Sequence, residues 1–278
     1  MDDLQSLPWP QPHLHYDVLA LVFVLGLGYA YAERRLRHLV APAAAPATTG
    51  QWVKWYTGLA FMFAVSSWPI HDVGETALFW VHMVEHMVII FVTAPLLLLG
   101  TPRWMADATI GRPGVARVLR QIVHPVPAFT ILTIVLIGIH WPVVVEWMLV
   151  SAVAHFAIHA LLFTAALIAW MPVRSPTPAL PRLEPPMAMF YLFLHSLLPT
   201  IPASFLTFSS VPIYPVYGDA ALAWGVTPLT DQTMAGLIMK LGGGLLLWGA
   251  IAVIWFRWVA REREWDRIEA DLRTSTRA

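Results

Sequence analysis

Two pairs of histidines have a spacing that suits metal chemistry: His82 with His86, and His155 with His159. On a helix, residues four apart lie on the same face, so each pair would present two imidazoles one turn apart. Neutral imidazole is the commonest metal ligand in proteins, and such a pair supplies two ligands from one rigid element. The spacing therefore predicts that these four histidines coordinate a metal.

Two further histidines, His140 and His195, lie in predicted membrane spans together with these pairs. Counting 1.5 Å per residue from the outer boundaries puts all six in roughly the outer two thirds of the bilayer. A single histidine in a span usually bridges helices as a hydrogen-bonded polar group worth about 1 kcal/mol. Six of them, at a depth where ionisable groups are costly, favour a functional site. Pro199 follows His195 by four residues, which predicts a helix kink centred on His195.

The chain has no cysteine, which excludes disulfides, thiolate ligands and iron–sulfur clusters. Any metal must be held by histidine, methionine, carboxylate or backbone oxygen. Met83 and Met87 lie beside His82, and Met234 and Met239 lie on the last predicted span. Methionine is usually a core gap-filler, but its thioether also binds Cu(I). If such a site holds copper, Cu(I) is the oxidation state that we expect in the absence of cysteine.

Two other functions fit parts of the pattern. The segment from His82 to His86 reads H-x-x-E-H, the order found in inverted zinc proteases, with Glu85 in the place of the general base. Glu85 could instead pair with Lys240, the one cation predicted inside the membrane. Two histidines from different helices could also be the axial ligands of a b-type haem in an electron carrier.

The elements that must position these residues are membrane-spanning helices. The chain is 58% hydrophobic and only 12% charged, and apolar runs of about 20 residues recur, each long enough to cross a bilayer. We expect an all-α, polytopic transmembrane bundle that forms a single domain over residues 1–278, with its core at 17–258 and a cytoplasmic tail at 259–278. Its seven predicted spans are Leu14–Ala32, Trp52–Ile70, Ala77–Leu99, Val126–Val145, Trp147–Trp170, Met187–Phe208 and Met234–Phe256.

Every Lys and Arg except Lys240 flanks or lies in the first, third or fifth connection or the C-terminal tail. The positive-inside rule therefore puts the N-terminus outside, the C-terminus in the cytoplasm and the histidines nearer the outer face. A net charge of zero gives no indication of a nucleic-acid partner.

Several short motifs occur together along the chain: the two H-x-x-x-H pairs, Ala94-Pro95-Leu96 with Gly100-x-Pro102, His140-Trp141, Tyr214-Pro215-x-Tyr217, and Asp231-Gln232-x-x-Ala235-Gly236-x-x-Met239. In this order and spacing the chain resembles the polytopic CtaG family of cytochrome c oxidase assembly factors. The resemblance extends from about Trp52 to Phe256.

The resemblance implies a non-enzymatic, multi-pass protein of the bacterial inner membrane that helps to mature haem–copper oxidase by handling copper. Its partners would be cytochrome c oxidase subunits or other assembly factors, together with the lipid bilayer. The predicted metal site then comprises His82, His86, His140, His155, His159, His195, Asp231 and Met239.

Overall fold

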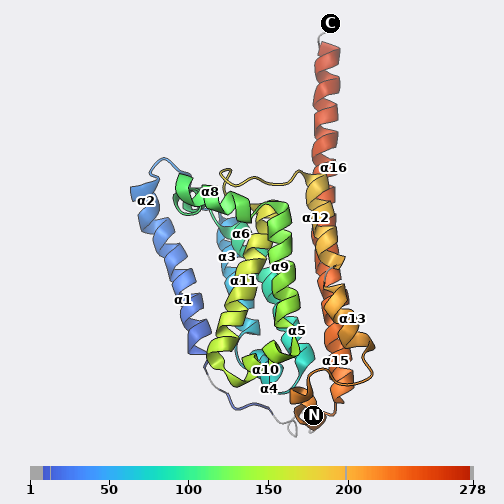
Figure 1. The fold of residues 1–278 in the computed structure, drawn as a ribbon. Coiled ribbons are helices and arrows are strands. Elements are labelled where there is room, and N and C mark those ends of the chain that lie inside the picture. The colour runs from blue at the N-terminus through green and yellow to red at the C-terminus, as the bar shows by residue number, and fades with distance from the viewer. Residues whose placement is uncertain (1–8, 13, 198, 276–278) are drawn as a thin grey trace, which may run out of the picture.

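The computed structural model describes residues 9–12, 14–197 and 199–275, and this part of the chain is all-helical, with 80% helix and no strands (Figure 1). The α-helices are α1 Tyr16–Tyr31, α2 Arg37–Val40, α3 Thr49–Val65, α4 Ile70–Thr76, α5 Phe79–Val88, α6 Ala94–Gly100, α7 Arg103–Ala108, α8 Pro113–Ile122, α9 Pro125–Ile139, α10 Pro142–Val150, α11 Ala152–Arg174, α12 Pro185–Leu197, α13 Thr200–Phe208, α14 Gly218–Ala223, α15 Pro228–Leu237 and α16 Gly243–Ser275. The π-helical turns η2 Ala32–Leu36, η3 Ile89–Thr93 and η5 Ile238–Gly242 continue α1, α5 and α15, and η4 Pro215–Tyr217 is a 3₁₀ turn.

Five helical segments of the described chain are long and apolar enough to cross a membrane. They are Tyr16–Val40, Phe79–Gly100, Ala152–Arg174, Pro185–Phe208 and Pro228–Glu269. The pair α8 and α9, bent by 66°, makes a sixth if it is one span. The all-α class and the membrane helices are thereby confirmed, while the number of seven spans and their orientation stay predictions.

Two predicted spans give helices shorter than expected. α3 has 17 residues and ends before Pro69, and α9 has 15 residues and ends before Pro142. Proline has no amide hydrogen to continue a helix, and it disfavours the α conformation in the residue before it. The predicted spans Trp52–Ile70 and Val126–Val145 therefore extended too far at their C-terminal ends.

Two other boundaries also differ from prediction. The span predicted at Trp147–Trp170 begins instead at Ala152, because the side chain of Ser151 caps α11 by accepting a hydrogen bond from the first helical turn (3.3 Å). The span predicted at Met187–Phe208 consists of two helices, α12 and α13. α12 continues through His195 to Leu197 and α13 begins directly after Pro199, so the boundary between the two helices lies at the proline and not at His195, where the kink was predicted.

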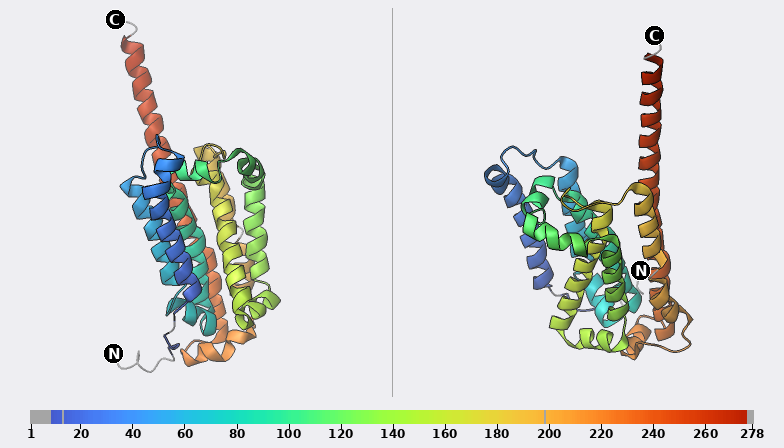
Figure 2. Two further views of the ribbon diagram at one scale, coloured as in Figure 1. Left: turned by 90° about the vertical axis from the view of Figure 1, so that its left-hand side faces the viewer. Right: turned by 45° about the horizontal axis from the view of Figure 1, so that its top comes forward.

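The central element is the run from α5 through η3 to α6, which packs against α3, α11 and α15. α9 packs against α11, and α12 against α16. Figures 1 and 2 show α1 along one side of the bundle and α16 extending past the end that carries α2 and α8. The short helices α4 and α10 lie at the other end. The core is built of fully buried aliphatic side chains such as Ile90, Ala94 and Leu162.

Close packing of α4 on the start of α5 depends on Gly74. A Cβ at this position would lie 2.9 Å from the backbone nitrogen of His82, nearer than real Cβ atoms come. Glycine therefore lets the α4 backbone approach α5, and this contact brings the polar side chains of α4 beside the first histidine pair.

Candidate metal centre

The two histidine pairs face each other across the interface of α5 and α11. The ring of His159 lies 5.1 Å from that of His86 and 5.4 Å from that of His82, measured between centroids. The ring of His155 lies 6.1 Å from that of His82. The structure thus brings the four imidazoles that share the i,i+4 spacing into one cluster.

Three of these residues form a group that we call the histidine triad: His82, His86 and His159. Each offers a ring nitrogen, and these atoms lie within 4.8 Å of one another. His82 and His86 are 1% and 2% exposed. Both nitrogens of His82 and of His86, and Nε2 of His159, have no hydrogen-bond partner among the described residues. A buried polar atom without a partner costs about 1–3 kcal/mol, so these nitrogens are candidate ligands for a bound group.

Glu85 is fully buried beside the histidine triad. It accepts hydrogen bonds from Ser66 Oγ (2.8 Å) and from Nδ1 of His71 (2.9 Å to Oε2). The predicted pairing of Glu85 with Lys240 is wrong, since the ammonium of Lys240 lies over the ring of Phe208, 5.8 Å from its centroid. The carboxylate therefore belongs to the histidine cluster, with imidazole and hydroxyl as its partners.

α4 contributes residues that the sequence analysis did not select. His71 Nε2 lies 3.5 Å from Glu75 Oε2, and Glu75 Oε1 lies 3.3 Å from Nδ1 of His155. We call these three residues, whose ligand atoms also lie within 4.8 Å of one another, the mixed triad. Next to them Asp72 is bonded to His15 at 3.0 Å. The i,i+4 spacing of His71 and Glu75 was the available signal, but it lies in a connection outside the predicted spans.

The charge of α4 is set by its neighbours. Burial lowers the pKa of His71, but the hydrogen bond and negative charge of Glu85, with the charges of Glu75 and Asp72, outweigh it and raise this pKa to about 9. Burial raises the pKa of Glu75, but the close contact with His155 and the other nearby imidazoles lower it overall. Without a metal, His71 is therefore a cation held between carboxylates.

His140 lies at the edge of the cluster, with its ring 6.2 Å from that of His86. Its Nδ1 donates to the carbonyl of Leu136 (2.6 Å), which leaves Nε2 facing the sulfur of Met83 at 3.4 Å. In the neutral imidazole Nε2 then carries a lone pair. A nitrogen and a thioether sulfur that face each other are a suitable pair of donors for a soft cation.

The structure places the other three predicted ligands elsewhere. His195 packs against the rings of Phe129 and Tyr191, with centroids 4.8 and 4.5 Å away. The carboxylate of Asp231 accepts hydrogen bonds from the first two backbone N–H groups of α5, at 2.9 and 3.0 Å, so it acts as a helix cap supplied by α15. Met239 is buried in the main apolar core.

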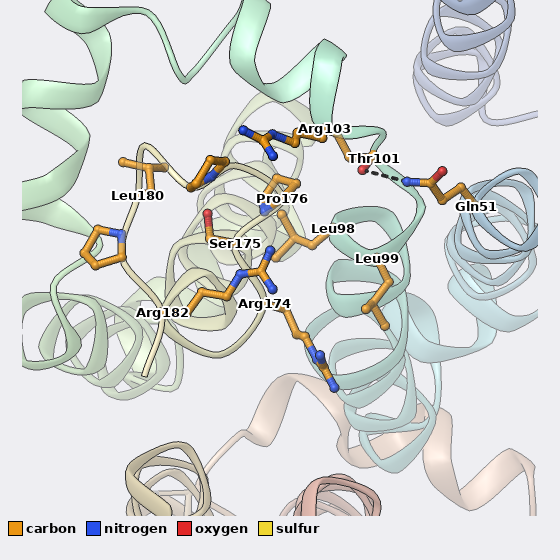
Figure 3. Close-up of a pocket in the computed structure, with 12 residues that line it drawn as sticks. Gln51, Leu98, Leu99, Thr101, Arg103, Arg174, Ser175, Pro176, Leu180 and Arg182 are labelled. Atoms are coloured by element: carbon orange, nitrogen blue, oxygen red, sulfur yellow. Dashed lines mark hydrogen bonds between the residues drawn. The ribbon is translucent and has the colours of Figure 1, made fainter. Parts of the chain in front are cut away.

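The arginine-bearing end of the bundle has a different character. A cavity of about 520 Å³ opens there and is lined by Arg103, Arg174 and Arg182 (Figure 3). The side chain of Gln51 closes one edge by donating to the carbonyl of Thr101 (3.4 Å). This cavity shares no residue with the histidine cluster, so these three arginines and the metal-ligating groups occupy separate parts of the molecule.

A bundle of long apolar helices with imidazoles and carboxylates buried among them is the architecture of a polytopic membrane protein. The family model described as cytochrome c oxidase caa3 assembly factor (Caa3_CtaG) matches residues 27–261, which include both triads. The chain therefore belongs to this family of assembly factors, as its motifs predicted. No curated protein and no solved structure matches it.

Proposed function

We propose that this protein assists the assembly of cytochrome c oxidase by binding copper in the histidine triad and delivering it to the oxidase. The family supplies the setting of oxidase assembly in a membrane. The proposal adds the metal, the residues that hold it and a non-catalytic role. It also places the protein in the bacterial inner membrane, with oxidase subunits or other assembly factors as its partners.

One observation carries the proposal: both ring nitrogens of His82 and of His86, and Nε2 of His159, are buried without hydrogen-bond partners in the described structure. Three neutral nitrogens are a good ligand set for Cu(I). A singly charged ion is also the least costly metal cation to bury among uncharged ligands, since the desolvation cost rises with charge. His140 and Met83, at the edge of the same cluster, extend the set with a nitrogen and a soft sulfur.

The orientation of the chain supports delivery from the outer side. α4 lies at one end of the bundle, and the arginines lie at the opposite end. The positive-inside rule assigns the arginine-bearing end to the cytoplasm. We therefore assign the mixed triad and the histidine triad to the half of the membrane that faces the periplasm.

The geometry gives less support to the alternatives. The four imidazoles of α5 and α11 pack ring against ring, with centroids 4.3–6.1 Å apart, so a porphyrin would have to separate them. Glu85, the base required of a protease, is 0% exposed and already accepts two hydrogen bonds. A general base must reach the proton that it abstracts in the bound substrate.

The test is the double substitution His82→Ala/His86→Ala in the full-length protein. We expect the purified variant to lose at least tenfold in Cu(I) affinity, because two of three ligands are removed. Cells that carry it should have low cytochrome oxidase activity although the oxidase subunits are made, with partial restoration by added copper through mass action.

His195→Ala is the matched control, because it removes a buried imidazole that lies against Phe129 and Tyr191 instead of in the cluster. It should keep Cu(I) affinity and oxidase activity. If the double variant keeps full oxidase activity under copper limitation, the cluster is structural and the copper proposal fails.

A further inference from the structure

The mixed triad of His71, Glu75 and His155 has the geometry of a metal site in its own right. Its ligand atoms lie within 4.8 Å of one another, and they come from two helices, α4 and α11, whose side chains meet. The rings of His71 and His155 are 4.9 Å apart. Two imidazoles and one carboxylate, held by rigid elements, are a ligand set typical of divalent transition-metal ions.

The hydrogen bonds of His71 orient it as a ligand. Its Nδ1 donates to Glu85, at 2.9 Å to Oε2, and this leaves Nε2 directed at Glu75. A metal-ligating histidine usually gives its other ring N–H to a carboxylate, which fixes the tautomer and makes the ligand nitrogen more basic. Glu85 thus orients His71 through a hydrogen bond and is not itself a ligand of the mixed triad.

The two triads differ in charge and in access to water. The histidine triad carries no formal charge, whereas the mixed triad includes a carboxylate that offsets part of a divalent charge. The side chain of Glu75 is 28% exposed, while those of His71 and His155 are 9% exposed. An ion that enters beside Glu75 therefore meets the mixed triad before it reaches His82 and His86, which are 1% and 2% exposed.

We propose that His71, Glu75 and His155 form a second metal site that binds a divalent transition-metal cation at the mouth of the cluster. His155 connects the two triads, because its ring stacks on that of His159 with centroids 4.5 Å apart. The pair of sites forms a two-ion centre in which Glu85 lies between the ligands of both. This inference rests on the proposed function, which assigns copper to the histidine triad. It deepens that function by placing beside the copper site a second site that prefers a divalent ion.

The experiment compares two variants and two probe ions, using the full chain purified in detergent and stripped of metal. Co(II) is the probe for the mixed triad, because its visible d–d absorption reports the ligand set, and Cu(I) is the probe for the histidine triad. Glu75→Gln removes the ligand charge at nearly constant shape. We expect it to lower Co(II) affinity by at least tenfold and to leave Cu(I) affinity within about twofold of the unsubstituted protein.

His82→Ala/His86→Ala should show the reverse pattern, with Cu(I) affinity lost and the Co(II) spectrum retained. Glu146→Gln is the matched control, because Glu146 is an exposed glutamate on α10, at the same end of the bundle. It should bind both ions as the unsubstituted protein does. Thermal unfolding of each metal-free variant shows whether a loss of binding is a loss of fold.

Three results separate the two proposals. Unchanged Co(II) binding in Glu75→Gln overturns the second site and leaves the copper proposal standing. Loss of both ions in both variants, with folding intact, means one shared site and also overturns the second site. Loss of Co(II) in Glu75→Gln while the double variant keeps Cu(I) supports the second site and removes the proposed copper site.

Discussion

Two buried glutamates, one toward each end of the bundle, have opposite surroundings. Glu33 in η2 lies 3.3 Å from the guanidinium of Arg37 and accepts hydrogen bonds from Trp104 Nε1 and the backbone N–H of Ala47, both at 2.8 Å. Glu85 in α5 has an imidazole and a hydroxyl as its hydrogen-bond partners. The first carboxylate is paired with a permanent cation, whereas the second is paired with an imidazole, which can lose a proton, and with a neutral hydroxyl.

The different partners give the two carboxylates different roles. Arginine cannot be deprotonated in a protein, so the pair of Glu33 and Arg37 is fixed and structural. Imidazole can exchange its proton for a metal ion, and Glu85 then becomes the support of a metal ligand. A buried glutamate therefore stabilises the fold at the arginine-bearing end, whereas a second buried glutamate belongs to a candidate binding site at the other end.

The largest effect concerns the orientation of the two ends. We expect a reporter that is active only in the periplasm to be inactive when fused after Ala278 and active when fused after Ser151, because arginines flank the cytoplasmic ends of spans. Reporter activity in intact cells measures this directly. The reverse pattern would place the histidine cluster nearer the cytoplasm and remove the assignment of an outward-facing site.

The next effect separates the two glutamates. Glu85→Gln should weaken metal affinity by about 10–100-fold, as expected for loss of a supporting carboxylate. Glu33→Gln should leave metal affinity unchanged and destabilise the fold by about 1–3 kcal/mol, because Arg37 loses its charged partner. Metal titration and thermal unfolding of the same samples measure the two effects. Equal loss of metal affinity in both variants would show that the fold, and not Glu85, controls binding.

The smallest effect comes from two glycines at close helix contacts. A Cβ at Gly74 would lie 2.9 Å from the backbone nitrogen of His82, and one at Gly100 would lie 2.7 Å from that of Trp55. Alanine at either position should destabilise the fold by about 1–3 kcal/mol, as for other overpacked contacts. Only Gly74→Ala should also weaken metal binding, because α4 carries His71 and Glu75.

Gly249→Ala is the control for these substitutions, because a Cβ there meets no atom within 4 Å. Its unfolding temperature should not fall, and it could rise because alanine is the better helix former by about 1 kcal/mol. If Gly100→Ala weakens metal binding as much as Gly74→Ala, the contact of α4 with α5 has no special part in forming the site.

Much of this arrangement could be predicted from local pattern. The i,i+4 spacing of the two histidine pairs specifies a shared helix face at any position in the fold, and the apolar runs specify membrane helices. The helix ends were harder to predict. Pro69, Pro142 and Ser151 shorten or shift three spans, because a proline or a capping side chain ends or starts a helix inside a run of apolar residues.

The predicted ligands that lie outside the cluster show a second limit. Asp231 is a polar residue in a motif of the family, yet its carboxylate caps the first turn of α5, to which no sequence pattern connects it. His195 was predicted at a membrane depth similar to that of the other histidines, but its ring packs against two aromatic rings. Depth follows from counting residues along one helix, whereas direction depends on how that helix is rotated against its neighbours.

The class of the molecule follows from its amino-acid pattern: the backbone of its apolar runs can be satisfied in lipid only as helices, and its arginines lie in alternate connections. The same pattern also determined that the histidines of each pair share a face, because this follows from the geometry of a single helix. That α4 lies beside the histidine pairs is visible in the three-dimensional packing alone. The contact of Gly74 with α5 brings His71 and Glu75 close to His155. Because His155 is far from both of them in the chain, this approach depends on packing between helices and not on local spacing.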